Sequence, residues 1–192
     1  MRIVGGKWRG RQIEAPEGRG VTRPTTDRMR ESIASTILSA RGLDLAGCSV
    51  LDAFAGSGAM GLELLSRGAD RATFVDRDRR AVARIRRTAS ALGAGEGDVC
   101  ALGGDVFALA AHGLAGAPFD IVFLDPPYAV AAERVSALVE GLADSGQLAP
   151  GAVVVYEHAA DAASLDCGCL EPVRSRTHGI TTVDLLAAKT AR

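Results

Sequence analysis

The chain has 192 residues, of which 47% are hydrophobic, 23% are charged and only 4% are aromatic. This length predicts one domain with at most a small appendage, and the apolar content is sufficient for a core of Ala, Val, Leu and Ile. The formal net charge of −1 excludes a basic field over the whole protein. No uninterrupted run of apolar residues approaches the length of about 18 residues that a membrane-spanning helix needs.

The N-terminal region is predicted to be a small basic extension. Its apolar pieces, Ile3-Val4 and residues 12–15, indicate a β-hairpin joined by residues 7–11, and a proline-containing linker follows. We therefore expect residues 1–24 to form this extension and residues 25–192 to form the main domain. Residues 2–31 hold eight Arg or Lys against four Asp or Glu, a balance of +4, and an acidic excess follows residue 95. This asymmetry favours an anionic partner near the N-terminus, although the same charges also fit a solvated arm.

The remainder of the chain alternates strands and helices. A helix is predicted from Thr25, Thr26 or Asp27, each suited to cap its start, to about Arg41. Predicted strands then cover residues 49–53, 72–75, 99–102, 119–124, 152–157, 170–176 and 181–187, and predicted helices cover residues 59–67, 78–92, 107–114 and 131–145. Repeated strand–helix units predict a mostly parallel α/β sheet with helices on both faces. The last two strands, joined at His178-Gly179, predict an antiparallel pair at one edge.

The segment Asp125-Pro126-Pro127-Tyr128 directly follows the predicted strand 119–124. An ionised aspartate only accepts hydrogen bonds, and proline has no N–H, so this turn presents acceptors without competing donors. Tyr128 adds a flat face for stacking. These groups suit a planar ring with an exocyclic NH2 group. The sequence therefore predicts that a nucleobase amine is presented here for chemistry.

Each of the first four predicted strand ends carries an acid, namely Asp52, Asp76, Asp105 and Asp125. Ligands of open α/β sheets bind beyond the carboxyl ends of the strands, so these acids predict a site for a cationic or donor-rich ligand. The alternative is that the acids only cap the helices that follow.

The loop Gly56-Ser57-Gly58 opens the helix after the first strand, and residues 56–61 match G-x-G-x-x-G. With Asp76 twenty positions after Gly56, this pattern is typical of NAD or FAD binding. Asp52 argues against a dinucleotide, because a carboxylate before this loop repels a pyrophosphate. S-adenosylmethionine (SAM) carries an ammonium and a sulfonium instead, so Asp52 favours SAM. Asp76 is then expected to bind the ribose hydroxyls, and Asp105 the adenine N6 amine.

The four cysteines, Cys48, Cys100, Cys167 and Cys169, lack the paired spacing of a metal site, so no metal is expected. We interpret them as reduced, mostly buried thiols. The polar first residues do not form a signal peptide, and both observations favour a cytoplasmic protein.

Residues 52–58, Asp76 and residues 125–128 resemble the motifs of class I SAM-dependent methyltransferases, and residues 125–128 are similar to the Asp/Asn-Pro-Pro-Tyr/Phe motif of amino-methylating members. Residues 3–11 and 23–31 are similar, more narrowly, to the RsmD family, and the likeness extends from residue 3 to about residue 188. The resemblance implies a Rossmann-like, seven-stranded, mostly parallel sheet with an antiparallel edge strand. It also implies methylation of a guanine N2 amine in bacterial 16S ribosomal RNA. His178-Gly179 stands where the family has Tyr-Gly.

Three sets of candidate residues follow from the motifs and the resemblance. The catalytic set is Asp125, Pro126, Pro127 and Tyr128. The cofactor-binding set is Asp52, Phe54, Gly56, Ser57, Gly58, Asp76, Arg77, Asp105 and Val106, with Thr25 and Arg28 as candidates for the SAM carboxylate or, alternatively, as parts of an ordinary capped helix. The RNA-binding set is Lys7, Trp8, Arg9, Arg11, Arg23 and Arg30, with a structural role as the alternative for Trp8.

The predicted reaction is transfer of the SAM methyl group to a guanine of 16S rRNA, free or in a 30S assembly intermediate, by a monomeric enzyme. Asp125 and the Pro126 carbonyl accept the amine N–H bonds while Tyr128 stacks on the base, which must be flipped out or unpaired. Three alternatives stay open. They are an NAD(P)-dependent oxidoreductase, a DNA adenine or cytosine methyltransferase, and a ribosome-assembly factor without activity.

Overall fold

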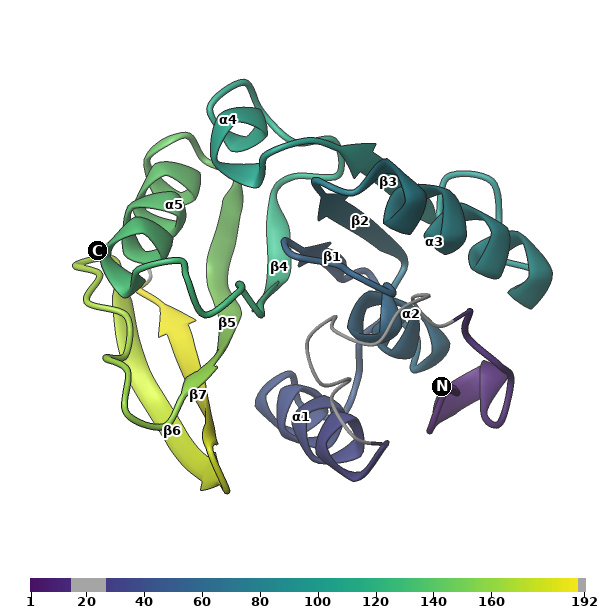
Figure 1. Ribbon diagram of the computed structural model, residues 1–192, viewed down its shortest axis with the longest axis horizontal. Helices are drawn as coiled ribbons and strands as arrows, with labels where there is room; N and C mark the ends of the chain where they lie inside the picture. The colour runs from purple at the N-terminus through teal and green to yellow at the C-terminus, as the bar shows by residue number, and fades with distance from the viewer. Residues whose placement is uncertain (15–26, 190–192) are drawn as a thin grey trace.

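The computed structural model describes residues 1–14 and 27–189 (Figure 1). The predicted linker and the boundary at residue 24 lie outside these residues. The described strands are β1 (Ser49–Asp52), β2 (Arg71–Asp76), β3 (Val99–Gly103), β4 (Phe119–Leu124), β5 (Leu148–Ala159), β6 (Leu170–His178) and β7 (Thr181–Ala188). The described helices are α1 (Asp27–Ala40), α2 (Ala59–Ser66), α3 (Arg79–Leu92), α4 (Val106–Ala110), α5 (Ala132–Asp144) and the short 3₁₀ helix η1 (Gly6–Trp8).

The seven strands form one sheet in the order β3-β2-β1-β4-β5-β7-β6. β1 to β5 are parallel, and β7 is antiparallel to both of its neighbours, β5 and β6. The predicted α/β class, the strand number and the final antiparallel pair are confirmed. The antiparallel strand lies one position in from the edge, however, and β6 is the outermost strand. The tight turn at Gly179, with φ +65°, reverses the chain so that β7 inserts beside β5.

Helices cover both faces of this sheet and create two cores. Residues of α1, α2 and α3 pack in one buried cluster, and residues of α4 and α5 pack in the other. Neighbouring strand residues alternate between the clusters, because successive side chains of a strand point to opposite faces. Val50 and Phe74 belong to the first cluster, whereas Leu51 and Val75 belong to the second. The central strands of the sheet are therefore buried on both faces and open to a ligand at their ends, whereas β6 is exposed along most of its length.

Two predicted boundaries are wrong for local reasons. β5 begins at Leu148, four residues before the predicted start, and its pairing with β4 shifts register between Phe119 and Ile121. The shift accommodates Pro150 and Gly151 within β5, although a proline and a glycine in sequence predict a break in a strand. α4 ends at Ala110 and not at Leu114, because the chain turns at Gly113, whose φ is +84°.

The N-terminal arm, residues 1–14, folds back on itself without forming regular strands. A single antiparallel bridge joins Arg2 and Gln12, and η1 occupies the segment between them. Two backbone hydrogen bonds of 2.9 Å each, from Ile3 N–H to Arg11 O and from Gly10 N–H to Ile3 O, close the loop. The predicted hairpin is thus reduced to one bridge. Ile3, Trp8 and Ile13 are buried in the cluster that contains α1, α2 and α3.

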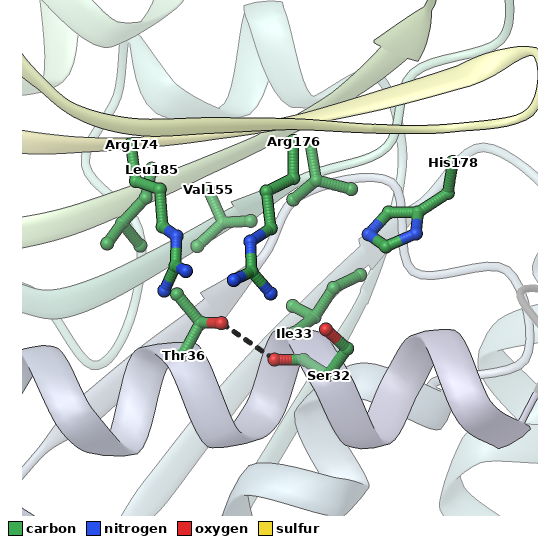
Figure 2. A pocket seen from close by; sticks show the side chains of 9 residues that line it. Ser32, Ile33, Thr36, Val155, Arg174, Arg176, His178 and Leu185 are labelled. Carbon is green, nitrogen blue, oxygen red and sulfur yellow. Dashed lines mark hydrogen bonds between the residues drawn. The ribbon is translucent and has the colours of Figure 1, made fainter.

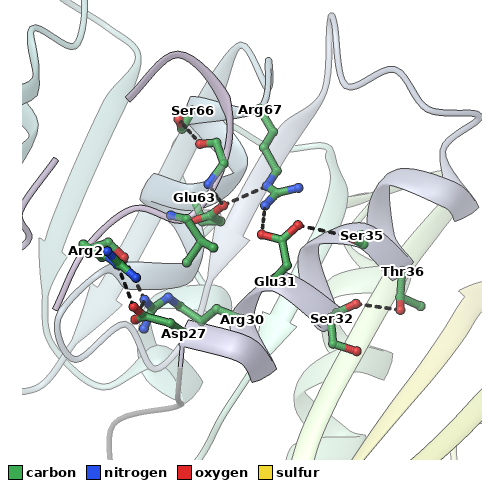
Figure 3. A network of polar contacts seen from close by, with 12 residues as sticks. Arg2, Asp27, Arg30, Glu31, Ser32, Ser35, Thr36, Glu63, Ser66 and Arg67 are labelled. Atoms are coloured by element: carbon green, nitrogen blue, oxygen red, sulfur yellow. Dashed lines mark hydrogen bonds and ion pairs between the residues drawn. The ribbon is translucent and has the colours of Figure 1, made fainter. Parts of the chain in front are cut away.

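Polar groups of α2 fix the arm in place (Figure 3). The fully buried Glu63 accepts the N–H groups of Val4 and Gly5 at 2.7 and 2.8 Å. Ser66 Oγ accepts the Trp8 N–H at 2.9 Å and donates to the Gly5 carbonyl at 2.6 Å. The arm is therefore anchored by side chains of α2, and a carboxylate buried as deeply as Glu63 needs these partners.

Candidate active site

The carboxyl ends of the parallel strands open into a cleft of about 440 Å³. β1 and β2 end in Asp52 and Asp76, Asp125 follows β4, and Asp105 lies in the loop after β3. All four strand-end acids thus line one site, whose volume lies in the range of small-molecule and cofactor pockets. The other predicted cofactor-binding and catalytic residues that line it are Phe54, Gly56, Ser57, Arg77, Val106, Pro126, Pro127 and Tyr128.

The glycine loop between β1 and α2 is built by left-handed backbone. Gly56 and Gly58 have φ values of +53° and +73°. A Cβ at Gly58 would lie 2.8 Å from the side chain of Ile85, and one at Gly61 would lie 2.3 Å from the ring of Phe74. Gly58 and Gly61 therefore allow α2 to pack closely, while Gly56 faces the cleft. Gly58, which was predicted to bind the cofactor, does not line the cleft.

Asp52 lies beneath this loop and is only 2% exposed. Its Oδ2 atom accepts the Gly61 N–H at 3.0 Å. Burial, opposed by that hydrogen bond and reinforced by the Asp125 and Asp76 carboxylates, raises the pKa of Asp52 to about 7. A cation in the cleft offsets this repulsion, whereas a pyrophosphate increases it. The acids therefore fit the ammonium and sulfonium of SAM.

Asp76 holds the two backbone segments that border the cleft. Its Oδ2 atom accepts the Gly56 N–H at 2.7 Å, and its Oδ1 atom accepts the Asp78 N–H at 2.8 Å. An ionised carboxylate has about four acceptor sites, so Asp76 can orient the loop and still accept from a ribose diol.

Asp105 caps the start of α4 beside an aromatic pair. Its Oδ1 atom accepts the Phe107 N–H at 3.2 Å, and its Oδ2 atom accepts from Arg77 at 2.6 Å. Although burial opposes ionisation, the Arg77 and Phe107 hydrogen bonds lower the pKa of Asp105. The rings of Phe54 and Phe107 are 5.9 Å apart, and the Arg134 guanidinium lies 4.0 Å from the Phe107 ring centre. These rings give a flat heterocycle such as adenine an apolar surface beside the acid.

The double-proline turn forms the opposite side of the cleft. Burial raises the pKa of Asp125 to about 6. The Val130 N–H donates to the Pro127 carbonyl at 2.8 Å and fixes the turn. Tyr128 is 68% exposed although it is large and aromatic. An exposed ring beside a half-buried acceptor is suited to stack on a base that enters from outside.

Not every predicted residue can be assigned to the cleft. Arg23 and Thr25 lie outside the described residues, and Arg28 is exposed and does not line the cleft. Two predicted RNA contacts require correction. Trp8 is 6% exposed and packs in the core, so its ring is not available for stacking on a base. Arg30 is 2% exposed and donates to Arg2 O at 2.7 Å, so it supports the wall of the cleft and cannot reach RNA on the surface.

The cleft also contains residues that the motif analysis missed. Glu157, near the end of β5, follows the apolar run of residues 152–156, so the strand-end rule applied to a fifth strand identifies it. Phe107 lies two positions after Asp105, in the first turn of α4, and was detectable as the aromatic residue nearest to that acid. Met1 and Ile180 also line the cleft, but no local pattern marks them, because only the folded chain brings the two segments to this place.

Metal clusters and membrane-spanning helices are not found in residues 1–14 and 27–189. These residues contain no cluster of three or more His, Cys, Asp or Glu side chains arranged for a metal ion. None of their helices has the length and hydropathy that a bilayer crossing requires. The four cysteines are free thiols, buried at Cys48 and Cys167 and partly exposed at Cys100 and Cys169.

The sheet order, the glycine loop and the double-proline turn define a class I SAM-dependent methyltransferase, and comparison with known proteins agrees. The family model described as "Conserved hypothetical protein 95" matches residues 1–187. The ribosomal RNA small subunit methyltransferase D of Escherichia coli K12 is 36% identical over 157 residues, which cover 82% of this chain and 74% of that protein. The Bacillus subtilis protein YlbH is 34% identical over 184 residues, covering 95% and 96% of the two chains.

Structural comparison gives the same result. The solved structure of the Escherichia coli protein yhhF superposes with a TM-score of 0.82 at 31% identity, and the match covers 100% of this chain and 99% of that one. The chain therefore belongs to the Conserved hypothetical protein 95 family, the RsmD family that its N-terminal motifs resemble. It is a SAM-dependent methyltransferase, and the oxidoreductase alternative is set aside.

Proposed function

We propose that this enzyme transfers the methyl group of SAM to the N2 amine of a guanine in 16S ribosomal RNA. The observation that carries the proposal is the turn of residues 125–128, which places a half-buried acceptor and an exposed aromatic ring at the mouth of the cleft that contains the other strand-end acids. The relative named ribosomal RNA small subunit methyltransferase D supports this class of substrate. The guanine N2 atom follows from the resemblance to the RsmD family.

Asp52, Asp76 and Asp105 are proposed to hold the cofactor together with the backbone at Gly56 and Ser57. When bound, SAM supplies an activated methyl group. Asp52 pairs with its cationic end, Asp76 accepts from the ribose hydroxyls, and Asp105 accepts from the adenine amine. Phe54, Arg77 and Val106 border the same part of the cleft.

The amine is positioned by the double-proline turn. An exocyclic base amine is a poor nucleophile because its lone pair is delocalised into the ring. Asp125 and the Pro126 carbonyl accept the two N–H bonds, which draws the nitrogen toward tetrahedral geometry, and Tyr128 stacks on the base. Asp125 need not be a strong base, because the protonated product amine is acidic. The rate gain comes from positioning and from preorganised acceptors.

The exposed basic residues of the N-terminal arm are proposed to contact phosphates. Lys7, Arg9 and Arg11 all lie on the surface, and Arg11 also donates to the Ala91 carbonyl at 2.6 Å. We further propose that the enzyme acts as a monomer in the cytoplasm, on a 30S assembly intermediate in which the target base is still accessible. A flipped or unpaired base is required in either substrate, since the cleft cannot admit a duplex.

The proposal is tested by methyl transfer in vitro. The purified protein is incubated with SAM and with 16S rRNA, either protein-free or in assembling 30S particles, and the nucleosides are identified by mass spectrometry. Wild-type protein should form N2-methylguanosine, and the Asp125→Ala protein should form far less, while both bind SAM with similar affinity. Methylated adenine or cytosine, or preferential transfer to DNA, would contradict the proposal. Absence of transfer to every substrate would favour an assembly factor.

A further inference from the structure

β6 carries a row of basic side chains outside the candidate active site. Arg174, Arg176 and His178 are exposed and stand two residues apart, so they share one face of the strand. Figure 2 shows both guanidinium groups and the imidazole pointing from β6 into the gap between this strand and α1. The ion pairs formed among the described residues do not include Arg174 or Arg176. Two unpaired guanidinium groups on one strand face are suited to an anion.

A polar stripe of α1 forms the other wall of this gap. Ser32 and Thr36 lie one helical turn apart, and Thr36 Oγ1 donates to the Ser32 carbonyl at 2.8 Å (Figure 2). Arg28 is exposed four positions before Ser32, on the same stripe. The acid of this segment, Glu31, is turned away and accepts from Arg67 at 2.6 Å (Figure 3). The gap is therefore lined by cations and hydroxyls, which are partners of phosphate oxygens, together with the apolar side chains of Ile33, Val155, Val183 and Leu185.

The gap lies beside the methyltransferase cleft. Three elements each contribute one residue to the gap and another, two or three positions away, to the cleft: Ile33 and Arg30 on α1, Val155 and Glu157 on β5, and His178 and Ile180 at the β6–β7 turn. Ile180 is 64% exposed and Tyr128 is 68% exposed, so both mark the mouth of the cleft with accessible apolar surface. A chain that leaves the cleft at this mouth can therefore follow β6.

We propose that the gap between β6 and α1 binds the phosphate backbone of the single-stranded RNA that flanks the target nucleotide. Arg174 and Arg176 contact successive phosphates, and His178 contacts the nucleotide next to the flipped base. The inference rests on the proposed function, because it assumes an RNA substrate. The inference adds an RNA-binding surface at the edge of the sheet opposite to β3. It also implies that Arg28 contacts the RNA and not the SAM carboxylate.

Charge-neutralising substitution tests the inference. The Arg174→Gln/Arg176→Gln protein is compared with wild type and with Arg71→Gln/Arg80→Gln, whose exposed arginines lie on β2 and α3, far along the sheet. Binding of a fluorescein-labelled single-stranded RNA is measured by anisotropy over a range of salt concentrations. Each phosphate contact contributes about 0.7 to the slope of log affinity against log salt, so the loss of two should reduce its magnitude by about 1.4. Affinity at physiological salt should fall about tenfold, and the control should match wild type.

Further readouts separate this inference from the proposed function. SAM affinity and thermal stability should be unchanged in Arg174→Gln/Arg176→Gln, and KM for RNA should rise while kcat at saturating RNA is retained. An unchanged salt slope, or an equal loss in the control, would overturn the inference. Normal RNA binding with reduced activity only on 30S particles would also overturn it and indicate a ribosomal protein partner. The RNA-binding assay involves no methyl transfer, so a wild-type protein that methylates no guanine refutes the proposed function without deciding this test.

Discussion

Substitution of Asp52 by Asn should stabilise the cofactor-free enzyme and weaken SAM binding. Asp52 is buried under the glycine loop, with a pKa raised from 3.8 to about 7. The stability contributed by its protonated form is complete below pH 3.8 and is lost as the pH rises through 7. At pH 8 the ionised side chain therefore destabilises the fold. The difference between the two pKa values corresponds to roughly 4 kcal/mol as an upper bound.

The Asn side chain imitates protonated Asp in shape and can still accept the Gly61 N–H. At pH 8 the Asp52→Asn protein should therefore gain up to roughly 4 kcal/mol, or about 10 °C in Tm for a chain of this size. At pH 4 the gain should vanish, because wild-type Asp52 is then protonated as well. SAM affinity at pH 8 should fall at least tenfold because the partner of the cationic end is lost. Such a trade of stability against binding is common at functional sites.

Differential scanning calorimetry of the cofactor-free proteins at both pH values and calorimetric titration with SAM make the measurement. Asp161→Asn, at an exposed position, is the matched control and should change neither quantity. A lower Tm for Asp52→Asn at pH 8, or a gain that persists at pH 4, would refute the electrostatic reasoning. Unchanged SAM affinity would remove Asp52 from the cofactor site.

Three further predictions follow from the same geometry. Asp125→Ala should lower kcat by about 10²–10³-fold with little change in SAM affinity, because one preorganised hydrogen-bonding group is lost. Single-turnover kinetics measures this effect, and a smaller loss of rate would contradict the role of Asp125. Wild-type turnover should fall as the pH drops below about 6, where Asp125 becomes protonated, and a flat profile between pH 5 and 8 would contradict that role. Gly61→Ala places a Cβ 2.3 Å from the Phe74 ring and should cost about 1–3 kcal/mol in thermal unfolding. Gly141→Ala in α5 meets no atom within 4 Å and should be neutral or slightly stabilising.

The order of elements and much of the site could be predicted because their signals are local. Alternating strands and helices follow from hydrophobic periodicity within short windows. The strand-end acids are brought together by a general rule, since parallel strands place their carboxyl ends at one edge of the sheet. The turn of residues 125–128 has a distinctive composition, so its chemistry could be predicted from the sequence. Glu157 could have been predicted in the same way, because it lies near the end of the fifth strand. It was missed because the strand-end rule was applied only to the first four strands.

Long-range packing decided the features that the sequence did not reveal. The arm of residues 1–14 looks polar and glycine-rich, yet Trp8 is buried. Glu63 and Ser66, more than fifty positions away, accept the backbone N–H groups of Val4 and Trp8 and hold the arm against α2. Arg30 looks like one more surface cation, but the fold encloses it beside the cleft. The insertion of β7 between β5 and β6 likewise depends on which strand edge is free to pair.

The sequence by itself therefore determined the class of fold, the order of its elements and the chemistry at the strand ends, because each depends on neighbours within a few positions. Only the tertiary structure decided which cations face solvent and which are enclosed, and that β6 and α1 line one gap beside the cleft. Those properties depend on burial and on contacts between distant segments. No short window of residues encodes them.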